Sequence, residues 1–190
     1  MPAQSLFILD AAFRSGAVSL AILAAILLLR ARGDAARFGV ALMIAAACAA
    51  MDGMAGLRLP FAAAVLCAIG SSLAVPLFWL FARAWFDDGF RPRAADAALV
   101  VVFASLAVFL QTQPPSLPLT RGLDLTLYVA GTAMAGHAQW LVWRGREDDL
   151  VEERRRARSI FVITVGLVIV WSLWSEAYVR ITGPLSLIHI

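Results

Sequence analysis

The sequence predicts an all-α fold, a polytopic bundle of transmembrane helices with its N-terminus outside the cytoplasm. Hydrophobic residues make up 62% of the 190-residue chain, compared with roughly 45–50% in a soluble domain, and the mean hydropathy is +0.82. The apolar residues gather in six segments of about 20 residues, the length that crosses a bilayer as a helix. Because lipid offers the backbone no hydrogen-bond partner, segments this apolar are predicted to be helical.

In chain order, the predicted spans are residues 7–29, 38–57, 62–84, 95–112, 123–143 and 159–180. Pro76 lies inside the third span, and a proline there predicts a kink because it lacks the N–H that continues a helix. Small residues recur four apart in the second and fifth spans, which favours close helix packing. They are Ala45, Ala49 and Gly53, and Gly131 and Ala135.

The longest polar stretch, residues 144–159, separates the fifth and sixth spans. Its six arginines are nearly balanced by five acidic residues, which disfavours binding of nucleic acid or lipid headgroups. Asp149 and Glu152 are spaced like an acidic capping box, and the order of acid before base suits the helix dipole. The sixth helix is therefore predicted to begin near Asp149 and to enter the membrane near Ser159.

Arginine placement predicts the orientation. Twelve of the sixteen arginines flank the first, third and fifth connections, and cytoplasmic loops are the ones enriched in basic residues. These connections are therefore predicted to be cytoplasmic, with the N-terminus and the residues after the sixth span outside. On this interpretation the sequence pI of about 9.5 reflects topological anchors and gives little support to bound nucleic acid.

Charged residues inside the membrane are candidate functional residues because they are costly to place there. Asp52 lies in the second predicted span among small neighbours, and Glu176 lies near the outer end of the sixth. We expect Asp52, with Glu176 and the proline-rich connection after the fourth span, to line an outward-facing pocket for a cationic or hydrogen-bonding ligand. The alternative is a structural Asp52, bonded to a neighbouring helix or to Arg58.

Two of the acids near the outer ends, one of them Glu176, also have a simpler explanation. Asp10 is followed one helical turn later by Arg14, and Glu176 by Arg180, so both are predicted to form ion pairs on their own helices. His137 is predicted to be a hydrogen-bonded core residue and not a ligand.

The sequence gives no support to an enzyme, a metal site or a cofactor. No His, Cys or carboxylate cluster has metal-ligand spacing, and no phosphate-binding glycine loop is present. Cys48 and Cys67 lie inside apolar segments and are predicted to be small buried residues, not a disulfide.

Two predicted cytoplasmic stretches carry a family resemblance. FWLFAR and FDDGFRPR, within residues 78–93, and DDLVEERRR, within residues 143–161, resemble loops of the membrane-embedded input domain of some bacterial AraC-type transcriptional regulators. Such proteins have a multi-helix membrane domain, usually of seven spans, followed by a cytoplasmic double helix-turn-helix that binds DNA. The resemblance covers the six spans in order and implies residence in the bacterial inner membrane.

The resemblance also implies what the chain does. Residues 1–184 would be a sensor domain that receives a small-molecule or membrane signal, with DNA bound only through a seventh span and a DNA-binding domain absent from this chain. AraC-type DNA binding makes a homodimer the expected assembly. The residues expected to hold the topology and couple the signal are Arg83, Asp87, Asp88, Arg91, Arg93, Arg144, Arg146, Asp148, Asp149, Glu152, Arg154, Arg155 and Arg156.

The last six residues, 185–190, have a reverse translation that matches a transposon-end adapter used in sequencing libraries, so the native sequence is expected to stop near Pro184. Two other functions remain open. One is a small transporter or channel subunit, with Asp52, Glu176 and the Pro76 kink along its pathway. The other is a structural membrane partner that binds no ligand.

Overall fold

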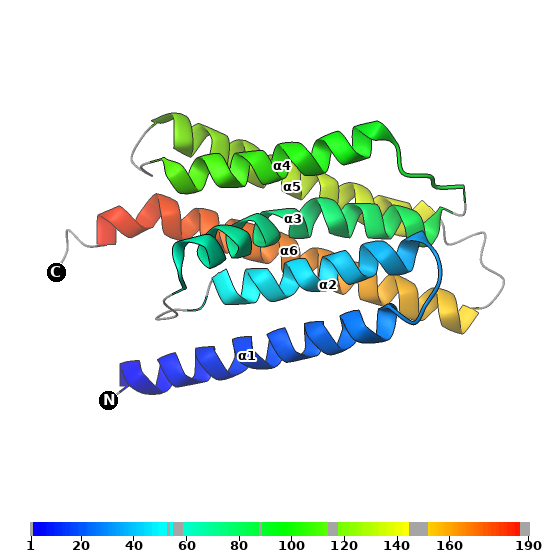
Figure 1. Ribbon diagram of the computed structural model, residues 1–190, viewed down its shortest axis with the longest axis horizontal. Coiled ribbons are helices and arrows are strands. Elements are labelled where there is room, and N and C mark those ends of the chain that lie inside the picture. Colours follow the sequence, from blue (N-terminus) through cyan, green and yellow to red (C-terminus); the bar gives the residue numbers. More distant parts are fainter. Residues whose placement is uncertain are drawn as a thin grey trace.

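The computed structural model is an antiparallel bundle of helices (Figure 1). It describes residues 2–52, 54, 59–87, 89–113, 118–144 and 152–186, and within these ranges it contains six helices and no β-strand. The helices are α1 (Pro2–Leu28), α2 (Asp34–Asp52), α3 (Phe61–Phe86), α4 (Ala94–Thr112), α5 (Pro118–Arg144) and α6 (Glu152–Ser186). The all-helical prediction is confirmed for the described part of the chain.

Successive helices run in opposite directions, so the connections alternate between two ends of the bundle (Figure 1). We call the end where α1 begins and α6 finishes the terminal end; α2 and α4 also end there, and α3 and α5 begin there. The helices have their other termini at the opposite end, which we call the arginine-rich end after the basic residues that join these termini in the sequence.

Helix α3 is the centre of the bundle. It contacts α2, α4 and α5 extensively and α6 over a small area, whereas the described contacts of α1 are with α2 alone. The main hydrophobic core joins α2, α3, α5 and α6, and Phe78, Ala82, Ala138 and Val162 are fully enclosed in it. This core lies in the half of the bundle nearer the arginine-rich end.

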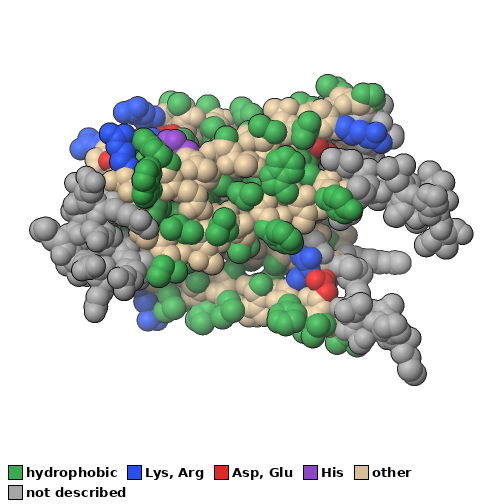
Figure 2. Space-filling model, turned by 180° about the vertical axis from the view of Figure 1, so that it is seen from behind, with side chains coloured by type: hydrophobic (Ala, Val, Ile, Leu, Met, Phe, Trp, Pro, Cys, Tyr) green, Lys and Arg blue, Asp and Glu red, His purple; other side chains and the backbone are tan. Residues whose placement is uncertain are grey.

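Four helices are long and apolar enough to cross a membrane, namely Ile8–Leu28, Asp34–Asp52, Phe61–Phe86 and Ala94–Thr112. In α6 the apolar stretch Ser159–Ser175 is shorter. Large hydrophobic side chains remain exposed along the helices, including Phe13 and Trp171 at 71% and 77% exposure. Figure 2 shows this apolar surface between charged residues gathered towards the two ends. A surface this apolar is typical of a protein whose solvent is lipid.

The end of the second helix differs from the prediction. Helix α2 ends at Asp52 and not near residue 57: the Met54 N–H bonds the Met51 carbonyl in a turn, outside the helix. Gly53, Gly56 and Pro60 in the sequence all disfavour continuing the helix. Asp52 therefore lies at the terminal end of its helix instead of inside a span. Arg83, one of the residues expected to hold the topology, lies in the last turn of α3.

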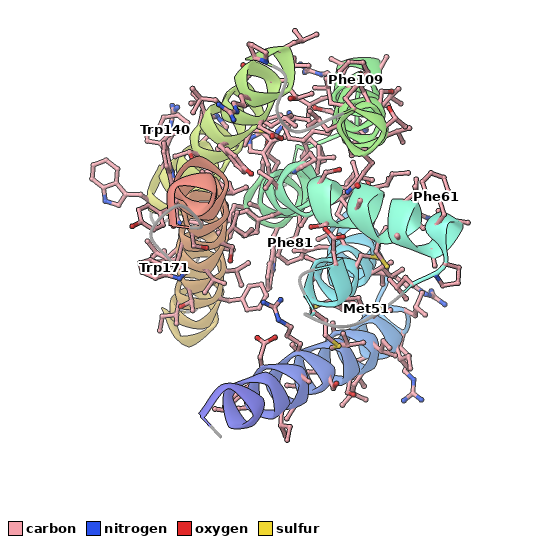
Figure 3. The ribbon with its side chains drawn as sticks, turned by 90° about the vertical axis from the view of Figure 1, so that its left-hand side faces the viewer. Met51, Phe61, Phe81, Phe109, Trp140 and Trp171 are labelled. Carbon is pink, nitrogen blue, oxygen red and sulfur yellow. The ribbon has the colours of Figure 1, made fainter. Side chains whose placement is uncertain are left out.

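Helix α3 continues through Pro76 but is bent. Figure 3, which looks along the bundle, shows the first turns of α3 near Phe61 running across the view. Pro76 lacks the N–H that would bond the Ser72 carbonyl, which is the usual origin of such a bend. The first turns of α3 therefore run at an angle to the rest of the helix.

Candidate functional site

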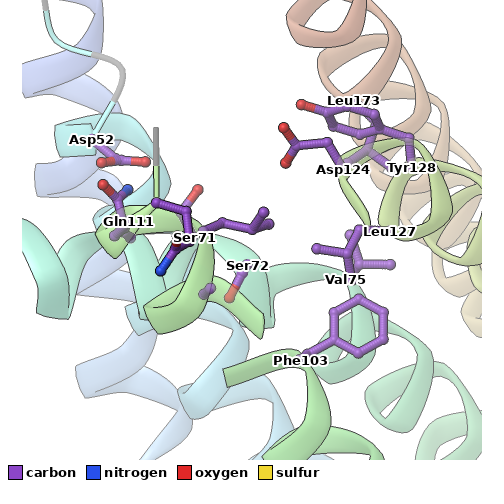
Figure 4. A pocket seen from close by; sticks show the side chains of 14 residues that line it. Asp52, Ser71, Ser72, Val75, Phe103, Gln111, Asp124, Leu127, Tyr128 and Leu173 are labelled. Atoms are coloured by element: carbon purple, nitrogen blue, oxygen red, sulfur yellow. The ribbon is translucent and has the colours of Figure 1, made fainter. Parts of the chain in front are cut away.

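A cavity of about 360 Å³ opens in the terminal half of the bundle (Figure 4). Side chains from five helices, α2 to α6, surround it. The lining residues are Asp52, Ala68, Ser71, Ser72, Val75, Phe103, Ala107, Leu110, Gln111, Gln113, Asp124, Leu127, Tyr128 and Leu173. Its volume falls in the range of cavities that hold small organic molecules.

The lining changes from polar to apolar along the bundle axis. Asp52 and Gln111 lie at or near the terminal ends of α2 and α4, whereas Phe103 lies eight residues deeper in α4, or about 12 Å at 1.5 Å per residue. Val75, Leu127 and other apolar side chains complete the deeper part (Figure 4). The cavity therefore has a polar mouth and an apolar floor.

Small side chains on the central helix, α3, leave room for the cavity. Ala68, Ser71 and Ser72 face the cavity from α3 just before Pro76. The Ser72 hydroxyl donates to the Ile69 carbonyl of its own helix, at 2.9 Å, so it is folded against the backbone and fills little of the volume. The small residues and the bend at Pro76 therefore lie next to each other in the sequence, and both help to leave the cavity open.

Close helix contacts fix the walls. On one side, a Cβ at Gly70 would lie 2.6 Å from Cys48 Sγ, so α2 and α3 touch through a glycine. On the other, a Cβ at Gly131 would lie 3.0 Å from Leu173, which joins α5 to α6. The lining residues Asp52 and Leu173 are thus carried by helices that cannot move closer without displacing a neighbour.

The α5–α6 wall also holds polar contacts. The Trp174 indole N–H donates to the Thr132 hydroxyl at 3.1 Å, and that hydroxyl donates to the Tyr128 carbonyl at 2.8 Å. Deeper in the bundle, the Gln139 amide donates to the Ile163 carbonyl of α6 at 3.2 Å. These bonds help to explain how α5 packs in an apolar bundle although its sequence is more polar than those of α1 to α4.

An ion pair dominates the arginine-rich end. Arg83 of α3 donates to Asp96 of α4 at 2.6 Å, and the backbone N–H of Arg93 donates to the other carboxylate oxygen at 2.9 Å. The Arg83 guanidinium lies 4.5 Å from the ring centres of both Trp79 and Phe90. The carboxylate side chain is only 9% exposed, so this contact holds α3, α4 and the end of their connection together.

Aromatic side chains extend this cluster into α5. The Trp79 indole N–H donates to His137 Nδ1 at 2.9 Å. The His137 ring lies 5.6 Å from that of Trp140, over which Arg144 lies at 5.2 Å. His137 is hydrogen-bonded as predicted, but it is exposed at the bundle surface and not in the core.

The structure separates the predicted site residues into two groups. Asp52 lines the cavity, whereas Arg83, Asp87, Arg93 and Arg144 lie at the opposite end. Asp87 accepts the Gly89 N–H at 3.0 Å and so shapes the start of the α3–α4 connection. The predicted pair of Asp10 and Arg14 is present, with Arg14 Nε 2.9 Å and 3.0 Å from the two carboxylate oxygens.

Several predictions concern residues or side chains outside the part of the chain that the structure describes. The side chain of Glu176 lies outside the described part, as do those of Glu152, Arg154, Arg155 and Arg156. So do Arg58, Asp88 and the polar residues Arg146, Asp148 and Asp149. Arg91 is exposed in the α3–α4 connection. The expected partnership of Glu176 with Asp52 and the predicted start of the sixth helix near Asp149 stay predictions.

Sequence reasoning missed two acids. Asp124 lies inside the fifth predicted span and lines the cavity across from Asp52; the rule that singled out Asp52, that a membrane charge is costly, applies equally to it. Asp96 stands three residues after Arg93, at a position where an acid caps a helix. Its pairing with Arg83 is a contact between helices that sequence spacing does not reveal.

The lining supplies charge, hydrogen bonds and apolar contact, but no described group of three His, Cys, Asp or Glu residues that could hold a metal ion. Searches of protein-family models, curated proteins and solved structures find no match to the chain. The function is therefore inferred from the cavity and from the packed arginine-rich end opposite to it.

Proposed function

We propose that the chain is a membrane-embedded sensor domain whose cavity receives a small ligand, as the AraC-type resemblance implies. The observation that supports this most directly is the construction of the cavity from five helices. A ligand in contact with all five favours one packing of the bundle over another. Differential affinity of this kind is what a ligand needs in order to shift a conformational equilibrium.

The proposed topology has six spans, with the terminal end outside and the arginine-rich end in the cytoplasm of a bacterial cell. Helices α5 and α6 contain 27 and 35 residues, or about 40 and 50 Å of helix, longer than a hydrocarbon core of about 30 Å. Both lie alongside the four apolar helices (Figure 1). The basic residues of the three connections at one end support the orientation.

A sensor fits the packing better than a channel or a transporter pathway. Beyond the apolar floor, Phe78, Phe81 and Val142 close the bundle with exposures of 5% or less. The cavity therefore ends against a tightly packed layer, which is suited to passing on a change in helix packing.

The output is proposed to pass through the arginine-rich end to a cytoplasmic DNA-binding domain of AraC type, acting as a homodimer. Sequencing the source locus past codon 184 tests this directly. We expect the frame to continue into a seventh apolar segment and a basic, helix-rich domain of about 100 residues, a common domain size. A stop codon directly after Ile190 in clean genomic DNA would contradict the regulator.

The sensor role of the cavity is tested in the intact gene. Ser72→Leu places a larger side chain in the cavity wall, whereas Ser105→Leu adds the same group to an exposed face of α4. We expect Ser72→Leu alone to change the transcripts that differ between the wild type and a deletion strain. Normal transcripts with Ser72→Leu, in a protein present at wild-type amounts, would rule out the cavity as the input site.

A further inference from the structure

We propose that the cavity binds an organic cation that carries an apolar or aromatic group, such as an alkylated or aryl-substituted ammonium ion. The proposal rests on the proposed function, because it assigns a ligand class to the same cavity. It follows from the charge, the ring chemistry and the depth profile of the lining, each of which is a separate observation.

The formal charge of the lining is negative. Asp52 from α2 and Asp124 from α5 contribute one carboxylate each, and no Lys, Arg or His occurs among the described residues of the lining. Figure 4 shows the two acids on opposite sides, with Asp124 directed into the space. A carboxylate has several lone pairs, so each wall can accept hydrogen bonds from a cation and contributes a favourable electrostatic interaction with it, whereas it offers no donor to an anion.

Aromatic and amide groups line the cavity together with the two acids. Tyr128 lies one turn from Asp124 on α5, and Phe103 faces the cavity from α4. An aromatic face attracts a cation, most strongly one that is easily desolvated, such as an alkylated ammonium. Gln111 and Gln113 at the mouth offer carbonyl oxygens for any N–H groups of the ligand.

The floor requires the rest of the ligand to be apolar. Val75, Leu127 and Leu173 line it together with Phe103, about 12 Å below the mouth. A hydrated inorganic ion gains nothing from such a surface, and the described carboxylates form no metal-binding group of three. A molecule with a charged head at the mouth and a hydrocarbon or ring at the floor matches both halves.

The experiment compares two probes of nearly the same shape. Benzyltrimethylammonium is the cation, and neopentylbenzene, in which carbon replaces the nitrogen, is its neutral counterpart. Binding to the purified 190-residue chain in lipid nanodiscs is measured by equilibrium dialysis against empty nanodiscs at the same free concentration. We expect the cation to bind at least roughly tenfold more tightly than the neutral probe, a difference of about 1.4 kcal/mol, and benzenesulfonate not to bind.

Variants then test whether Asp52 and Asp124 cause the preference for the cationic probe. Asp52→Asn and Asp124→Asn together should reduce the preference for the cation to less than about threefold. Asp10→Asn is the matched control, because Asp10 pairs with Arg14 on α1 and is not part of the lining. Ser72→Leu should weaken binding of the cation without changing any charge. Elution as a single species from gel filtration shows that each variant is folded.

Equal affinity for the two probes, or a preference that survives the double substitution, would overturn the cation proposal. So would the absence of cation binding up to about 10 mM, well above the micromolar affinity common for small ligands. If the neutral probe binds and Ser72→Leu blocks it, the cavity remains a receptor site for a different class of ligand. The proposed function fails separately, when Ser72→Leu leaves transcription unchanged whatever the probes do.

Discussion

The two ends of the bundle use the same helices in opposite ways. At the terminal end α3 presents Ala68, Ser71 and Ser72, and a cavity remains between the helices. At the arginine-rich end the same helix presents Phe78, which is fully buried in the core. It also presents Phe81 and Trp85, whose rings pack edge to face with each other and with Phe161 of α6. The change from small to large side chains takes place within about ten residues.

The difference between the two ends predicts that the terminal end is adaptable and that the arginine-rich end is rigid. Apolar side chains gain little from association when the surrounding lipid is equally apolar, so close packing and interhelical polar bonds hold a membrane bundle together. The arginine-rich end has both, in its enclosed core and in the Arg83–Asp96 pair. The terminal end instead has a cavity between its described helices, which makes it the end where a ligand can alter helix positions.

The largest expected effect comes from truncating one phenylalanine at each end. Phe78→Ala should lower the free energy of unfolding by about 3 kcal/mol or more, because it removes a side chain with no exposed surface from a filled core. Phe103→Ala should lower it by roughly half as much, since Phe103 already borders the cavity and has fewer packing partners to lose. Unfolding in mixed micelles at increasing SDS measures both values.

The pair is closely matched, because Phe103 is also buried, at 7% exposure, and the chemical change is identical. Equal losses for the two variants would show that the cavity is filled or collapsed in the folded protein, and would remove the contrast between the ends.

A smaller effect is expected from two acids at the arginine-rich end. Asp96→Ala should lower the unfolding free energy by about 2–3 kcal/mol, because it leaves the half-buried Arg83 and the Arg93 N–H without their acceptor. Asp34→Ala should lower it by less than about 1 kcal/mol, since its pair with Arg37 is longer, at 3.4 Å, and more exposed.

Raised salt separates the two pairs further. The small contribution of Asp34 should decline in 1 M salt, where the Debye length is about 3 Å, while that of the shielded Asp96 persists. A loss for Asp96→Ala no larger than that for Asp34→Ala would show that Arg83 does not join α3 to α4.

The helical class was predictable because hydropathy acts over whole segments. Apolar runs about as long as a bilayer is thick dictate helices, and the third and fourth predicted spans end within two residues of α3 and α4. The end of α2 was less predictable, since Ala49, Cys48 and Met51 remain apolar up to the point where the glycines begin. Hydropathy alone does not register a helix end that turn-forming residues determine.

The candidate site was predictable only one residue at a time. Asp52 was found because an acid among apolar neighbours is conspicuous, and Asp124 was open to the same reasoning. Their shared cavity depends on how α2 and α5 are placed around α3, and helix spacing within one segment contains no information about that placement. The Trp79–His137 bond was hidden for the same reason, since its partners are 58 residues apart.

The smallest expected effect tests the packed end with a single methyl group. A Cβ at Gly166 would overlap the Gln139 amide and lie 3.4 Å from Phe78, whereas one at Gly136 meets nothing within 4 Å. Gly166→Ala should lower the unfolding free energy by about 1–2 kcal/mol by displacing the amide from its bond to the Ile163 carbonyl. Gly136→Ala should raise it by up to about 1 kcal/mol, through helix propensity.

A double-mutant cycle tests whether displacement of the Gln139 amide causes the loss of stability. If it does, Gly166→Ala is less harmful when Gln139→Ala is already present. Strictly additive losses would place the strain in the helix backbones and show that α5 and α6 are held together by their close approach, independently of the amide.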